Sequence, residues 1–107
     1  VMRFLGNRSP ATVGFWAVGR RAEVPVFEDE ICAKYLEALW LKEPMSFDSI
    51  QEALLNCEGA NRLRSKGQLE DLDYCVRLDI RSVVPVCHAS KSGFMVIKNY
   101  NLKGDVA

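Results

Sequence analysis

One amphipathic segment between two prolines constrains the fold of this chain most. After Pro25, the acidic residues Glu28-Asp29-Glu30 precede a run in which apolar residues recur every three or four positions. Such spacing places them on one face of a helix, and acids in a first turn complement the helix dipole. The apolar positions are Ile31, Cys32, Tyr35, Leu36, Leu39 and Trp40. Pro44 ends the pattern, because the residue before a proline disfavours helical geometry. The sequence therefore predicts its main helix between Pro25 and Pro44.

Four short runs have the composition of β-strands. They are rich in apolar, β-branched or aromatic residues and are bounded by turn residues. These runs are Val1–Leu5, Thr12–Val18, Val83–Val86 and Phe94–Ile97. Pro85 makes the third run an edge strand or a strand start, because proline donates no ladder hydrogen bond. With the helices, the expected order is β-β-α-α-α-β-β, which is a mixed α/β chain.

Two further helices are predicted after the main one. Asp48 is expected to cap the first of them, with Gln51 three positions later completing a capping box. Its buried stripe comprises Ile50, Ala53, Leu54 and Cys57. A second amphipathic segment contains Leu69, Leu72, Cys75 and Val76, and a short basic turn of helix, Asn61–Arg64, lies between the two. We expect these helices to cover one face of the sheet.

Length and charge narrow the class of protein. The chain has 107 residues, with 14 Lys and Arg against 14 Asp and Glu. A chain of this size buries one core, so we expect a single α/β domain over residues 1–107. Zero net charge argues against a nucleic-acid partner. Apolar runs such as Val13–Val18 are far shorter than the roughly 20 residues that cross a bilayer, and no secretory pattern occurs at the start. A cytoplasmic protein without a membrane partner is expected.

The sequence predicts that the cysteine and tryptophan side chains lie in the core. The four cysteines are irregularly spaced within apolar patterns, which favours reduced core thiols over disulfides. A zinc site is not expected, because no CxxC pair occurs and His88 is the only histidine. His88 and Cys87 are adjacent on a strand and should point to opposite faces. Trp16 and Trp40 are expected in the core.

The candidate site lies where a glycine turn leads from the second predicted strand into the main helix. Arg20 and Arg21 follow Gly19, and Glu28 and Asp29 open the helix. Open α/β sheets bind ligands at the carboxyl ends of their strands. The two arginines could hold a phosphate or sulfonate, and Glu28 or Asp29 could hold Mg²⁺. The alternative is that the acids only complement the helix dipole while the arginines are solvated.

Two segments resemble the 2-phosphosulfolactate phosphatase family. The first joins AVGRR, residues 17–21, to FEDEICAKYLEAL, residues 27–39; the second runs from Arg62 to Val86 and ends in VVPV. The resemblance implies a three-layer α/β/α fold with a mixed sheet. It also implies a phosphoric monoester hydrolase of coenzyme M biosynthesis that uses Mg²⁺ to convert 2-phospho-3-sulfolactate, a small anionic phosphate ester, into sulfolactate and phosphate.

The resemblance also assigns roles to the candidate residues. Glu28 and Asp29 would be the catalytic and metal-binding carboxylates, and Arg20 and Arg21 would bind the substrate. Such a site neutralises the charge of a leaving phosphoryl group.

Family members are longer, so the chain is expected to be a truncated, C-terminal portion of the family fold. Such a portion would associate with itself or with a complementing N-terminal half, because a divided sheet exposes a strand edge. Lys34 stands where the family has glycine, and Gly59-Ala60 stands where it tends to have Ser-Gly. These departures favour an alternative: a non-catalytic binding or interaction domain that keeps the fold without a complete active site.

Overall fold

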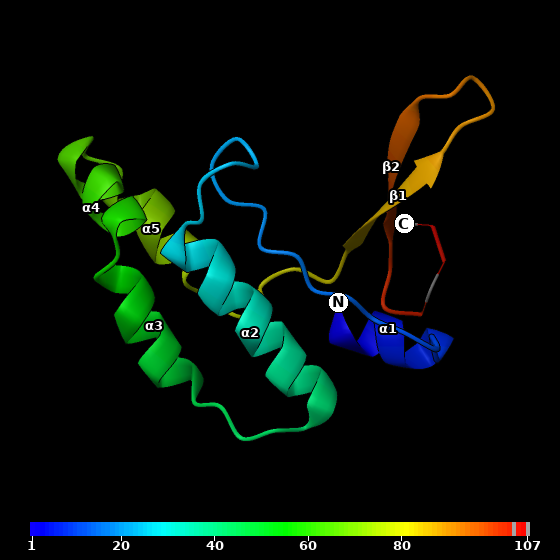
Figure 1. Cartoon of the computed structure of the whole chain (residues 1–107), viewed down its shortest axis with the longest axis horizontal. Coiled ribbons are helices and arrows are strands. Elements are labelled where there is room, and N and C mark those ends of the chain that lie inside the picture. The colour runs from blue at the N-terminus through cyan, green and yellow to red at the C-terminus, as the bar shows by residue number, and fades with distance from the viewer. Residues whose placement is uncertain (104, 107) are drawn as a thin grey trace. The chain divides into compact units, whose positions relative to one another are not determined.

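The computed structural model describes residues 1–103, 105 and 106, and it divides into two compact units. The terminal unit comprises Val1–Val13 and Asp79–Ala107, and the helical unit comprises Gly14–Leu78. The described residues form a small mixed α/β structure (Figure 1). Its elements are α1 (Met2–Arg8), α2 (Phe27–Leu41), α3 (Phe47–Leu55), α4 (Glu58–Ser65), α5 (Leu69–Cys75), β1 (Val84–Ala89) and β2 (Met95–Tyr100). A single domain over the whole chain stays a prediction.

The terminal unit begins with a helix, so the prediction of a strand at Val1–Leu5 is wrong. A short apolar run does not by itself distinguish a strand from a helix, and tertiary contacts decide between them. Here Phe4 is buried and meets the Tyr100 ring edge-on, with ring centroids 5.8 Å apart. Arg8, one helical turn later, places its guanidinium 4.3 Å from the centre of the Phe4 ring. Helical spacing brings both side chains to one face of α1.

The two C-terminal strands are confirmed and form an antiparallel pair. Val84 lies opposite Tyr100 and Ala89 lies opposite Met95. His88 is half-buried and Cys87 is exposed, so the two adjacent side chains take opposite faces as predicted. Among the described residues the sheet has two strands, which leaves one edge of β1 open. Pro85 is tolerated in β1 because a strand at an edge need not donate every backbone hydrogen bond.

The strand predicted at Thr12–Val18 does not form. The segment joins no ladder with any described residue, and the first bridge after it pairs Arg20 with Val24. β-Branched and aromatic residues favour a strand only where a neighbouring strand offers paired backbone groups. Trp16, expected in the core, is 89% exposed, whereas Trp40 is half-buried. The described part of the chain contains no helix long and apolar enough to cross a membrane.

The main helix is confirmed as α2, but the predicted capping box of the next helix is wrong. The residue at the N-cap of α3 is Ser46, without a side-chain cap, and Asp48 lies in the first turn. The Gln51 amide instead donates to the carbonyl oxygen of Val76 at 3.2 Å. This bond ties α3 to the end of α5. Tyr35 of α2 packs on Phe47 of α3, with ring centroids 5.5 Å apart.

The core of the helical unit lies where α3, α4 and α5 meet. Ala60, Leu72 and Val76 are buried together, and the half-buried residues around them are Leu54, Leu55, Cys57 and Leu63. The apolar faces of these helices therefore cover one another. All four cysteines are free, as predicted, but only Cys57 is partly buried. The expectation of core thiols is thus wrong for Cys32, Cys75 and Cys87, which lie at exposed positions of α2, α5 and β1.

Candidate functional site

A tight turn at residues 19–24 presents the two predicted anion-binding arginines. The backbone N–H of Arg20 donates to the Val24 carbonyl oxygen at 2.8 Å, and the Val24 N–H donates back at 3.2 Å. Arg21 and Ala22, at the tip, both have left-handed backbones, with φ of 54° and 57°. Positive φ at both central residues is typical of a type I′ β-turn, and the Glu23 N–H closes this turn by donating to the Arg20 carbonyl oxygen at 3.1 Å. The turn therefore keeps both arginines at the surface, where each is exposed.

Asp29 anchors this turn to the start of α2. Its Oδ2 accepts a hydrogen bond of 2.7 Å from the backbone N–H of Gly19. Gly19 itself has φ of +74°, and a Cβ there would lie 2.4 Å from the Val24 carbonyl oxygen. Glycine is thus required at that position, and the Asp29 carboxylate has a structural partner.

Glu28 points to a different neighbour. A Cβ on Gly59, in the first turn of α4, would lie 2.7 Å from Glu28 Oε1. Gly59 therefore lets the start of α4 approach the Glu28 carboxylate closely. The adjacent residues Glu28 and Asp29 are both half-buried. The Asp29 carboxylate accepts a hydrogen bond from Gly19, whereas the Glu28 carboxylate lies close to Gly59.

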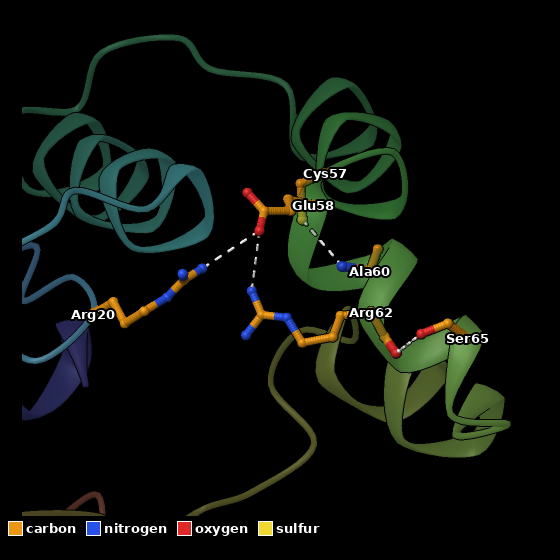
Figure 2. Close-up of polar contacts among 6 residues, drawn as sticks. All are labelled: Arg20, Cys57, Glu58, Ala60, Arg62 and Ser65. Carbon is orange, nitrogen blue, oxygen red and sulfur yellow. Dashed lines mark hydrogen bonds and ion pairs between the residues drawn. The ribbon is translucent and has the colours of Figure 1, made fainter.

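The structure brings Arg20 together with a second arginine that the family resemblance does not assign to the site. Arg20 Nη2 and Arg62 Nη2 each lie 3.5 Å from the same oxygen, Oε1 of Glu58 (Figure 2). The side chains of Arg20 and Arg62 are 49% and 48% exposed, and that of Glu58 is 82% exposed. We call Arg20 and Arg62 the arginine pair.

The start of α4 positions Glu58 and Arg62. Cys57 is the N-cap of α4, and its Sγ accepts a hydrogen bond from the Ala60 N–H at 3.5 Å (Figure 2). Glu58 and Arg62 are four residues apart, so they share one face of the helix. That spacing is visible in the sequence and could have identified this contact. The approach of Arg20 across 38 positions could not have been identified in that way.

Arg21 does not join the arginine pair. It projects from the tip of the turn, and its side chain has no ion pair with any described residue. Of the four predicted site residues, Asp29 and Arg20 thus flank the same turn, Glu28 lies beside α4, and Arg21 is solvated.

Glu28 and Asp29 are the candidate carboxylates of this region for holding Mg²⁺. Mg²⁺ requires near-octahedral oxygen ligands, commonly one or two carboxylates with waters and substrate phosphates. Among the described residues, no three Asp, Glu, His or Cys side chains gather closely enough to hold a metal ion. Asp29 is already bonded to Gly19, and Glu28 faces Gly59. The assignment of Glu28 and Asp29 as magnesium ligands stays a prediction.

Asp29 also lines a groove in the surface of the helical unit. It has a volume of about 320 Å³ and runs between the segment 14–18 and α2. Trp16, Val18, Cys32 and Leu36 contribute apolar walls, and Asp29 contributes the charged side chain. Asp29 therefore borders both the turn and this groove.

No family model, curated protein or solved structure matches the chain.

Proposed function

We propose that the chain is a binding module for a small phosphate- or sulfonate-bearing anion, without a complete hydrolytic site of its own. One observation carries this proposal: two guanidinium groups from distant segments converge on a single carboxylate oxygen. Guanidinium groups form paired, charge-assisted hydrogen bonds with carboxylate, phosphate and sulfonate oxygens. The position held by Glu58 Oε1 is thus suited to an oxygen of an external anion.

The surroundings of the carboxylates support binding rather than hydrolysis. Cleavage of a phosphate monoester needs a positioned nucleophile and groups that neutralise charge on the phosphoryl oxygens. Asp29 Oδ2 instead stabilises the turn through Gly19, at 2.7 Å, and the Glu28 carboxylate lies against Gly59. The arginine pair can neutralise charge, and the carboxylate that forms ion pairs with it among the described residues is that of Glu58.

The second candidate is a Mg²⁺-dependent phosphatase similar to 2-phosphosulfolactate phosphatase. It would take a three-layer α/β/α fold, of which this chain would be a C-terminal portion, completed by a second copy or by an N-terminal half. Arg20, Glu28 and Asp29 all lie around the junction of the 19–24 turn with the starts of α2 and α4. That gathering favours this candidate.

Phosphate titration at constant ionic strength tests the proposed binding. Backbone amide resonances of the ¹⁵N-labelled protein are followed as inorganic phosphate replaces chloride. We expect saturable shifts at Gly19, Arg20 and Arg62 that are lost in Arg20→Ala. Arg3→Ala is the matched control, because Arg3 is an exposed arginine of α1 in the other unit. Equal, unsaturable shifts in all three proteins would contradict the proposal.

An activity assay separates the two candidates. Phosphate release from 2-phospho-3-sulfolactate is measured with and without Mg²⁺. The binding module should release none. Metal-dependent release that disappears in Asp29→Ala would instead establish the phosphatase.

A further inference from the structure

The side chain of Glu58 contacts both guanidinium groups of the arginine pair, but these contacts hold it only weakly. Both N–O distances are 3.5 Å, longer than the 2.7–2.9 Å typical of strong charge-assisted hydrogen bonds. The Glu58 side chain is also 82% exposed, so it can turn into water without opening the core. Exposed ion pairs of this kind contribute little to stability. Glu58 is thus a weakly held carboxylate between two cations.

From this we infer that Glu58 is an internal competitor, which holds the arginine pair in the free protein and is displaced when an anion binds. The inference rests on the proposed anion-binding function and deepens it. In the free protein, Glu58 reduces the repulsion between the two guanidinium groups. In the complex, the ligand does so, and the Glu58 carboxylate is hydrated.

Because Glu58 competes for the arginine pair, a phosphate dianion and a simple carboxylate should differ in affinity for it. A monocarboxylate brings the same charge and the same two oxygens as Glu58 and must also lose its freedom of movement on binding. A phosphate monoester dianion brings a second negative charge and three terminal oxygens. Each guanidinium can then use its planar set of donors on the same group. The arginine pair should therefore bind a phosphate dianion and discriminate against a simple carboxylate such as acetate.

The test compares Glu58→Gln with a matched variant that removes the same charge elsewhere. Glutamine keeps the shape of Glu58 but ends the competition. Glu52→Gln is the control, because Glu52 is an exposed glutamate of α3 whose carboxylate lies outside the ion pairs of the site. Affinity for inorganic phosphate is measured by the amide titration described above, and circular dichroism checks that each variant is folded.

We expect Glu58→Gln to bind phosphate about two- to fivefold more tightly than the unmodified protein, the range that loss of an exposed ion pair allows. Glu52→Gln should change the affinity by much less. Acetate should bind measurably only to Glu58→Gln. Glu58→Asp, which keeps the charge but is one methylene shorter, should also bind phosphate more tightly, because it reaches the arginine pair less well.

Three outcomes separate the inference from the function on which it rests. Equal affinities in Glu58→Gln and Glu52→Gln, with binding still lost in Arg20→Ala, would overturn the competitor and leave the anion site standing. Binding that survives Arg62→Ala in the Glu58→Gln protein would also overturn the inference, since the pair would not be the site. No saturable binding in the unmodified protein or in Glu58→Gln would overturn both.

Discussion

Gly19→Ala is expected to destabilise the helical unit through two separable effects. Gly19 has φ of +74°, and its Cβ would lie 2.4 Å from the carbonyl oxygen of Val24. A left-handed backbone costs a residue with a Cβ roughly 1–2 kcal/mol. Relieving the clash moves a carbonyl oxygen that accepts the 2.8 Å bond from Arg20, and losing such a bond costs about 0.5–1.5 kcal/mol. Together these effects predict a loss of about 1.5–3.5 kcal/mol.

Gly67→Ala is the control that separates conformational strain from the clash. Gly67 also has a left-handed backbone, with φ of +71°, but a Cβ there would meet no atom within 4 Å. It should therefore cost only the roughly 1–2 kcal/mol of the left-handed backbone. The difference of about 0.5–1.5 kcal/mol between the two variants measures the contact with Val24.

Urea unfolding is the assay, followed by far-ultraviolet circular dichroism and by tryptophan fluorescence. Both tryptophans, Trp16 and Trp40, belong to the helical unit, so fluorescence reports on that unit. Gly19→Ala should also weaken phosphate binding, because the turn positions Arg20. A free energy of unfolding equal to that of Gly67→Ala would refute the reasoning.

Four further substitutions test other parts of the structure. Leu72→Ala should lower the free energy of unfolding by about 2–4 kcal/mol in the same urea assay, because Leu72 is buried. Trp16→Ala should change it by less than about 0.5 kcal/mol, because Trp16 is 89% exposed. Ala22→Gly should stabilise the turn by about 1 kcal/mol, since Ala22 has φ of 57°; a lower urea midpoint would contradict this. Tyr100→Phe removes the hydroxyl that lies 3.1 Å from His88 Nε2 and should cost about 0.5–1.5 kcal/mol, seen as a lower melting temperature; an unchanged melting temperature would show that the bond contributes nothing.

Two predicted features of the site depend only on local sequence and are found in the structure. The acids Glu28 and Asp29 do lie in the first turn of α2, and Arg20 and Arg21 do lie on a turn just before it. Helical periodicity and turn-forming residues act over a few positions, so they can be recognised from neighbouring residues alone. The residues that these side chains contact cannot be recognised from neighbouring residues in the sequence. The Asp29 carboxylate accepts from Gly19 across ten positions, and Arg20 meets Glu58 across 38.

The sequence by itself determined α2, the amphipathic helices α3 and α5 and the two C-terminal strands, because each depends on apolar spacing, on proline or on glycine within the segment. Only the tertiary structure decided that Val1–Leu5 is helical and that Thr12–Val18 is not a strand. A short apolar run suits either conformation until a neighbour supplies a ring to pack on, as Tyr100 does for Phe4, or a strand to pair with, which Thr12–Val18 lacks among the described residues. The same distinction applies to charge. The composition determines that the net charge is zero, whereas only the tertiary structure brings Arg20 and Arg62 to the same oxygen of Glu58.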